Sequence, residues 1–188
     1  MANLKDFFNM LLKNTPFVVV GKGDVNISVG ASLGLIVSGK WQPRWKIEKY
    51  NALGELYAVE EFAGNKLLDA GVTEMWNLIA GLGGTPFNNA NSYLGVGDDT
   101  TAASGEQTGL LGANTLYKAV DPTYPQINAQ TITYRAKYGS GEAAWAWQEF
   151  SIRNGDSDSA INICRKVDDH SSKPLADTWV LSLSITLS

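Results

Sequence analysis

Two segments of the chain alternate between apolar and polar residues as strands with one buried face do. Residues 177–187 place their apolar residues on one parity and their polar residues on the other, with Val180 as the exception. Residues 130–138 alternate in the same way. Successive side chains of a strand point to opposite faces, so both segments are predicted to be half-buried strands. The two apolar sets are Ile132, Tyr134, Ala136 and Tyr138, and Trp179, Leu181, Leu183, Ile185 and Leu187.

Further strand-like segments follow along the chain, separated by turn signals. Residues 41–51 and 56–62 read as a hairpin, and Asn154-Gly155 marks another turn. The remaining segments are 93–97, 116–120, 144–153 and 160–167. Many strands, few helices and no strand–helix–strand alternation predict a mainly β protein, which is an antiparallel β-sandwich or barrel of jelly-roll-like form.

One internal helix is predicted over residues 69–80. Asp69 can cap its N-terminus, and Gly81 favours a left-handed C-terminal cap. Four apolar residues recur at helical spacing along this segment. They are Val72, Met75, Trp76 and Ile79.

The first 40 residues differ from the rest and are predicted to form an N-terminal arm. Residues 2–14 read as a short amphipathic helix, which ends before Thr15-Pro16 because the residue preceding a proline is pushed out of the helical region. Residues 17–40 are rich in glycine. They are either one or two strands of the main body or an extended segment that pairs with a neighbouring subunit's sheet edge. The predicted organisation is therefore an arm over residues 1–40 and a β domain over residues 41–188.

Length, charge and cysteine content exclude several classes of protein but do not identify a partner. The chain has 188 residues, a net charge of −4 and one cysteine, Cys164. This length suits one domain, the acidity gives no nucleic-acid footprint, and a lone cysteine cannot form an intrachain disulfide. No segment reaches the roughly 18 uninterrupted apolar residues that span a bilayer, and no signal peptide is visible. We therefore expect no nucleic-acid partner, no membrane partner and synthesis in the cytoplasm.

Candidate catalytic groups are few. The single histidine, His170, lies in a polar loop and is predicted to be solvated. Asp98, Asp99 and Glu106 lie in a loop rich in glycine and threonine, where acidic residues more often cap turns than form the carboxylate pair of a glycosidase. The chain is therefore predicted not to be an enzyme.

Metal and nucleotide sites are not predicted either. Asn154, Asp156 and Asp158 alternate as calcium ligands sometimes do, but the run lacks the glycine and glutamate of an EF-hand. The glycine-rich segments contain no phosphate-binding loop with its lysine and hydroxyl. We therefore expect no cofactor and no metal ion.

Aromatic residues are the richest class of candidate binding groups. Trp145 and Trp147 point the same way from the predicted strand over residues 144–153 and could form a platform on which a sugar stacks. Large aromatic side chains in a small β protein more often fill its core or its subunit interface. The pattern alone leaves both interpretations open.

Several stretches within residues 65–188 form an ordered set. They are Glu74-Met-Trp-Asn-Leu-Ile-Ala-Gly-Leu-Gly-Gly84, Asn91-Ser-Tyr-Leu-Gly-Val-Gly-Asp98, Gln130-Thr-Ile-Thr-Tyr-Arg-Ala-Lys-Tyr-Gly-Ser140, Ala144-Trp-Ala-Trp-Gln-Glu-Phe150 with Asn154-Gly155, and Thr178-Trp179. Together they resemble a family of tailed-bacteriophage virion structural proteins. The resemblance leaves out the first 40 residues. It implies a component of the virion and brings no catalytic residues with it.

Among virion roles, a capsid decoration (cement) protein suits this chain best, because the chain is small and largely β and has an N-terminal arm that could lie across the capsid. Such a protein would lie on the capsid surface and bind the major capsid protein. Decoration proteins commonly trimerise, so a homotrimer is expected by analogy. Binding to the assembled head would stabilise it by ordinary linkage. We expect the arm to supply the capsid contacts. These contact residues are Phe7, Phe8, Leu11, Leu12, Phe17, Val18, Val19 and Val20.

The alternative is a tail-tip, fibre or baseplate module that binds host-surface glycans. In that case the exposed aromatics Trp145 and Trp147 would be the binding platform. The two hypotheses use opposite ends of the chain, since the first depends on residues 1–40 and the second on a loop or strand of the β domain.

Overall fold

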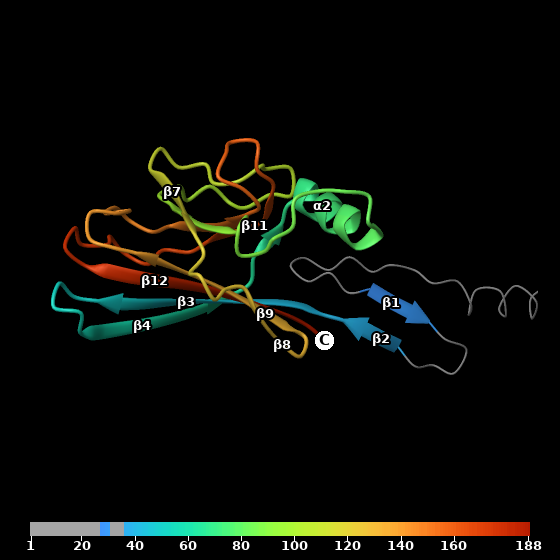
Figure 1. Ribbon diagram of the computed structural model, residues 1–188, viewed down its shortest axis with the longest axis horizontal. Coiled ribbons are helices and arrows are strands. Elements are labelled where there is room, and N and C mark those ends of the chain that lie inside the picture. Colours follow the sequence, from blue (N-terminus) through green and yellow to red (C-terminus); the bar gives the residue numbers. More distant parts are fainter. Residues whose placement is uncertain (1–26, 31–35) are drawn as a thin grey trace, which may run out of the picture.

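Two five-stranded antiparallel sheets face each other in the computed structural model of this chain, which describes residues 27–30 and 36–188 (Figure 1). In spatial order, the first sheet consists of β4 (Leu56–Ala63), β3 (Trp41–Tyr50), β12 (Thr178–Leu187), β9 (Thr131–Tyr138) and β8 (Gln126–Asn128). The second consists of β5 (Lys66–Leu67), β11 (Asn162–Val167), β10 (Glu149–Arg153), β6 (Tyr93–Gly97) and β7 (Thr115–Ala119). The predicted mainly β fold with an antiparallel sandwich is confirmed.

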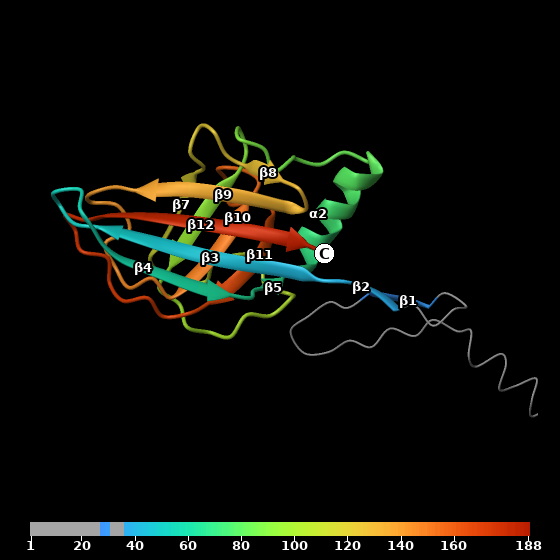
Figure 2. The same cartoon turned by 90° about the horizontal axis from the view of Figure 1, so that it is seen from below.

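The closing strand β12 is the centre of the first sheet. It pairs with β3 along its whole length, from Thr178 opposite Tyr50 to Leu187 opposite Trp41, and with β9 on its other side. Figure 2 shows these three strands running side by side across the face of the sheet. The parity predicted to be apolar is buried from Trp179 to Ile185, whereas Leu187 lies exposed at the end of the strand.

The side chains of β12 that point away from the core are less exposed than the alternating sequence pattern predicts. Val180 and Ser182 are both buried. Ser182 lies opposite Lys46 on β3 and Arg135 on β9, and long side chains of this kind cover small neighbours with their methylene stems. The face is polar, but the middle of its central strand is shielded from water.

The core lies between the inner faces of the two sheets and is rich in aromatic rings. Trp147 meets Tyr138 and Trp179 edge to face, each with ring centroids 4.9 Å apart. Trp45 stacks on Phe62 and tilts against Phe150. Edge-to-face and offset contacts of this kind are the favoured aromatic geometries. The core therefore joins residues from both sheets into a single packed layer.

Helix α2 (Asp69–Ala80) occupies the predicted range but departs from the prediction in two details. Its N-cap is Leu68 rather than Asp69, and no side chain caps it; the N–H of Asp69 donates instead to the carbonyl of Gly105. Gly81 is left-handed with φ of 67°, which confirms the predicted C-cap. The second detail concerns the face that the helix buries.

The apolar residues predicted at helical spacing in α2 do not form its buried face. Met75 packs against the core, but Trp76 and Ile79 are exposed. The buried residues are Gly71 and Glu74. Gly71 has no Cβ, so the helix backbone can lie directly against β11, and this close approach selects which face turns inward.

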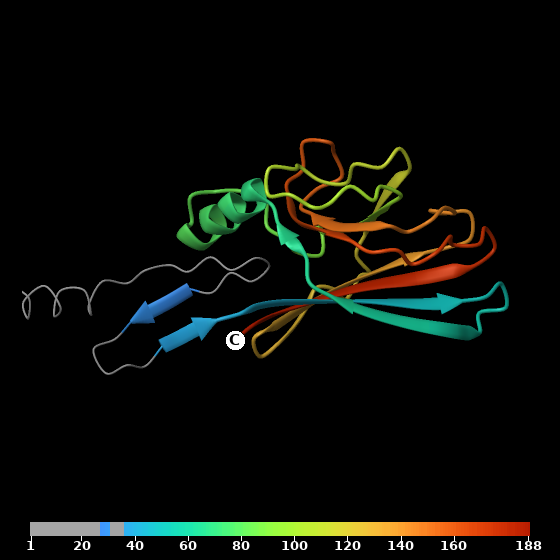
Figure 3. The same cartoon turned by 180° about the vertical axis from the view of Figure 1, so that it is seen from behind.

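Two short strands, β1 (Ile27–Gly30) and β2 (Ile36–Gly39), pair with each other and belong to neither large sheet. Figure 3 shows this hairpin leaving the body at the end where the C-terminus lies. For the part of residues 17–40 that the structure describes, β1 and β2 thus pair with each other, and Lys40 exchanges backbone hydrogen bonds with Ser188 of the main body. The predicted helix over residues 2–14 lies outside the described residues.

The strand predicted over residues 144–153 is wrong in its first half. Only β10, which begins at Glu149, is a ladder strand, and residues 144–148 hold a single bridge between Ala146 and Ser172. Within the described residues, no helix is long and apolar enough to cross a membrane.

Candidate interaction surface

The residues predicted to contact a capsid cannot be placed. Phe7, Phe8, Leu11 and Leu12, and the segment 17–20, all lie outside the described residues. The role of these eight residues stays a prediction.

The predicted tryptophan platform is contradicted at Trp147. The Trp147 ring is completely buried, and its Nε1 donates to the carbonyl of Ala143 at 3.0 Å. Trp145 is half-buried and packs against the core, and the pair does not lie on one strand. A sugar cannot stack on a ring that the core already encloses on its faces, so this pair does not form a glycan platform.

The long loop over residues 98–112 is anchored by turn-capping carboxylates, as predicted for two of its acidic residues. Asp99 accepts from the N–H of Thr101 at 2.7 Å, and Asp98 accepts from the N–H of Asn114 at 3.0 Å. These bonds stabilise turns. The carboxylates of Asp98 and Asp99 therefore stabilise the conformation of the loop.

The same loop is held to the body by a buried ion pair between Glu149 on β10 and Arg165 on β11. Both side chains are completely buried, and Arg165 Nε lies 2.6 Å from Glu149 Oε2. The other Glu149 oxygen accepts from the N–H groups of Leu111 at 3.0 Å and Gly112 at 2.7 Å. Buried charges persist when they are paired and hydrogen-bonded in this way.

The remaining donors of Arg165 reach across the loop. Its Nη1 donates to the carbonyl of Thr101 at 2.7 Å and to Gln107 Oε1 at 3.1 Å, and its Nη2 lies 2.9 Å from Asp99 Oδ1. The ion pair therefore organises residues 99–112 and has no donor directed at solvent. A buried carboxylate beside a guanidinium can serve catalysis, but here the hydrogen bonds of both groups stabilise the loop.

His170 is not solvated, contrary to its prediction as a loop histidine. It is buried against Phe62, with ring centroids 4.1 Å apart, and its Nδ1 lies 2.7 Å from Glu60 Oε2. Lys49 donates to the other Glu60 oxygen at 2.6 Å and to the carbonyl of His170 at 3.0 Å. These contacts close the edge of the sandwich beside β4, and apolar packing explains why a histidine from a polar stretch is buried.

Glu60 makes this edge sensitive to acid. Burial raises the pKa of Glu60, but the hydrogen bonds from Lys49 and His170 outweigh it and hold that pKa below its usual 4.5. A lowered carboxylate pKa stabilises the folded state above the unfolded pKa, and this stabilisation is lost as the pH falls through the folded pKa. About a third of the side chain is exposed, so water limits the effect to about 1 kcal/mol.

We therefore expect Glu60→Gln to lower the free energy of unfolding at neutral pH and to cost progressively less as the pH falls below the usual glutamate pKa of 4.5. Urea unfolding of both proteins across this range measures the difference. Glu61→Gln, which changes a neighbouring exposed carboxylate of the same strand, is the matched control. A Glu60→Gln deficit that is constant with pH would show that the carboxylate contributes nothing through its charge.

The run of Asn154, Asp156 and Asp158 does not form an ion site. Asn154 is buried and donates to Glu74 on α2 at 3.0 Å and to the carbonyl of Thr85 at 2.9 Å. Asp156 pairs with Arg153 at 3.1 Å. Among the described residues, no group of three or more His, Cys, Asp or Glu side chains is arranged to hold a metal ion.

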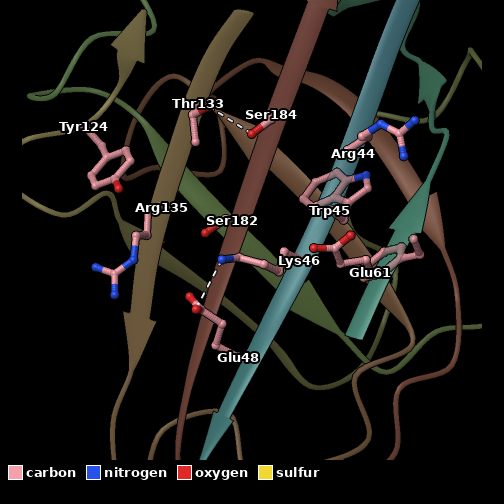
Figure 4. A pocket seen from close by; sticks show the side chains of 11 residues that line it. Arg44, Trp45, Lys46, Glu48, Glu61, Tyr124, Thr133, Arg135, Ser182 and Ser184 are labelled. Atoms are coloured by element: carbon pink, nitrogen blue, oxygen red, sulfur yellow. Dashed lines mark hydrogen bonds and ion pairs between the residues drawn. The ribbon is translucent and has the colours of Figure 1, made fainter. Parts of the chain in front are cut away.

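The outer face of the first sheet carries a shallow polar depression of about 360 Å³ (Figure 4). Its centre is Ser182 and Ser184 on β12, flanked by Lys46 on β3 and Arg135 on β9. Arg135 is paired with Asp121, and Lys46 lies 3.2 Å from Glu48. The charges of both signs largely satisfy one another, as on an ordinary solvated sheet face.

One group of exposed apolar side chains lies at one end of the sandwich, and we call this region the end surface. Figures 1 and 3 show α2, β8 and the C-terminus at that end. Five of its large apolar side chains are between 55% and 78% exposed. They are Trp76, Ile79, Leu82, Ile127 and Leu187.

The end surface also contains an apolar cavity of about 370 Å³. Ile127 and Leu187 line it together with Trp41, Ile132 and Ile185. Single exposed apolar residues are common, but exposed apolar residues that line an apolar cavity, as Ile127 and Leu187 do, indicate a site of interaction. Its mostly apolar lining suits apolar side chains of a protein segment.

Comparisons with protein-family models, with curated proteins and with solved structures find no match to this chain. The resemblance to tailed-bacteriophage virion proteins therefore stays a prediction from the sequence stretches that carry it. The fold and the end surface stand on the structure alone.

Proposed function

We propose that the protein is a non-enzymatic structural component of a bacteriophage virion, a decoration protein that binds the assembled head. The observation that carries this proposal is the end surface, an apolar region located where the N-terminal segment joins the sandwich. Such a region gives binding energy without chemistry. The ordered resemblance of residues 65–188 supports the virion as the setting.

The buried charges of the body are consistent with this role. Glu149 and Arg165 direct their hydrogen bonds at each other and at the loop over residues 98–112. A rigid body with anchored loops can present an attachment surface with little loss of conformational entropy on binding. Binding the major capsid protein and further copies of this chain, as a homotrimer, would stabilise the head by linkage.

Glycan binding is not proposed as a second function. It depended on Trp145 and Trp147 acting as an exposed pair, and Trp147 is completely buried.

The proposal is tested with heads purified from particles that lack the protein. We expect the full chain to sediment with these heads and to raise their thermal denaturation temperature, and residues 41–188 to do neither. Cooperative urea unfolding of residues 41–188 checks that the truncated protein is folded. Undiminished binding by residues 41–188, or no binding by the full chain, would contradict the proposal.

A point-variant series in the full chain gives the same test without truncation. Leu11→Asp with Leu12→Asp is expected to reduce head binding by at least about tenfold, since burying each leucine contributes about 1.5–3 kcal/mol. Leu53→Asp is the matched control, because Leu53 is an exposed leucine in the turn between β3 and β4. Equal losses in both proteins would show that the arm has no specific role.

A further inference from the structure

The end surface exposes several large apolar side chains to water, and covering them is energetically favourable. Trp76, Ile79 and Leu82 are exposed on and just after α2, and the cavity lies at the adjoining end of the first sheet. Each fully covered side chain of this size gains about 1.5–3 kcal/mol. A segment that covers the end surface would therefore be held with substantial affinity.

The N-terminal segment enters the body beside this surface. In the β1–β2 hairpin, Ile27 lies opposite Gly39, two residues before Trp41. Trp41 lines the cavity and pairs with Leu187. The hairpin thus brings residue 27 back to the end surface, and residues 1–26 begin from that point.

The composition of residues 1–26 matches the surface. Within the first 20 residues, eight of the apolar side chains form two groups, which residues 13–16 separate. The groups are Phe7, Phe8, Leu11 and Leu12, and Phe17, Val18, Val19 and Val20. We propose that residues 7–20 of the same chain cover the end surface in the free protein.

The tether favours the chain's own segment over that of a second copy. Six residues lie between Val20 and Ile27, and the seven Cα–Cα steps that join the two span at most about 25 Å when extended. A segment linked this closely to its site has an effective concentration in the millimolar range. At lower protein concentrations a second copy cannot compete, so the contact forms within one chain.

This contact has a consequence for attachment to any partner. The apolar residues of the arm and those of the end surface contact each other in the free protein, so neither set is available to a partner. A partner must offer the arm better apolar contacts than the end surface does. The inference does not rest on the virion role, and it holds for any partner.

The chain is suited to a direct test because its one native thiol is buried. Burial raises the pKa of Cys164 to about 12, so it stays protonated and unreactive in the folded protein. A nitroxide spin label on Asn14→Cys of the full chain lies between the two apolar groups without replacing either. We expect the label to broaden the backbone amide NMR signals of Ile79, Ile127 and Leu187.

A mixed sample separates the two sources of the segment. When a spin-labelled chain without nitrogen-15 is mixed with an unlabelled nitrogen-15 chain, contact within one chain predicts no broadening at the end surface. Broadening in the mixed sample would assign the contact to a second copy and overturn the inference. Absence of broadening in both samples would overturn it as well.

Two controls make the result specific. A label on Ala52→Cys, in the turn at the opposite end of β3, is expected to leave the end-surface signals intact. Replacing Leu11 and Leu12 with glutamine in the Asn14→Cys protein is expected to restore the end-surface signals and leave the core signals unchanged. Persistent broadening in that variant would show that the apolar residues do not make the contact. Because the sandwich residues are untouched, failure to fold is not the expected cause of any of these outcomes.

Discussion

Replacing Arg165 with methionine is expected to lower the free energy of unfolding by about 3–5 kcal/mol. The substitution leaves the carboxylate of Glu149 completely buried without its cationic partner, and it removes the donors that hold Thr101, Gln107 and Asp99. An uncompensated buried charge is among the costliest defects a fold can carry. Urea unfolding at neutral pH, followed by circular dichroism, measures the loss.

A double variant distinguishes the charge effect from lost packing. Arg165→Met combined with Glu149→Gln removes both charges but keeps an oxygen that can accept from Leu111 and Gly112. We expect it to be more stable than Arg165→Met alone. Arg44→Met, at an exposed position of β3, is the matched control and should change stability by less than about 0.5 kcal/mol. If Arg165→Met proves as stable as Arg44→Met, the structural role of the Glu149–Arg165 ion pair is contradicted.

The second large effect is expected at Gly71, where α2 lies against β11. A Cβ at this position would lie 2.5 Å from the carbonyl oxygen of Asn162 and 2.5 Å from Ile163 Cα, which are backbone atoms that cannot rotate away. Gly71→Ala should therefore cost about 1–3 kcal/mol through overpacking. This loss opposes the gain of about 1 kcal/mol that alanine brings to an ordinary helix interior.

Thr73→Ala is the control for helix propensity. Thr73 is exposed on the same helix, so its substitution should change the free energy of unfolding by less than about 0.5 kcal/mol. Urea unfolding compares the two variants under one set of conditions. A Gly71→Ala variant that is more stable than the original protein would contradict the close approach of α2 to β11.

Alternation predicted the strands well where one face of a strand is buried and the other is polar. The strands predicted over residues 130–138 and 177–187 match β9 and β12 to within one residue at each end. Alternation failed over residues 144–148, where large aromatics belong to an irregular segment whose Trp147 enters the core. Apolar character predicts burial there, but it cannot distinguish a strand from a loop that packs inward.

The candidate surface was less predictable because it depends on contacts between distant segments. Helical spacing identified Trp76 and Ile79 as one face, but the contact of Gly71 with β11 turned that face outward. Glu149 and Arg165 were not predicted as a pair, since they are 16 residues apart and meet only through the register of β10 and β11. A glycine inside a helix was the one available signal that a backbone approaches closely.

The central claim, that the protein decorates a virion head, is tested most directly by immunogold labelling of particles made by the genome that encodes it. Antibodies raised against the folded protein would be applied to intact particles and to particles made without it. The proposed function predicts label spread over the whole head surface and none on particles that lack the protein. Label confined to the tail, or no label on any particle, would contradict it.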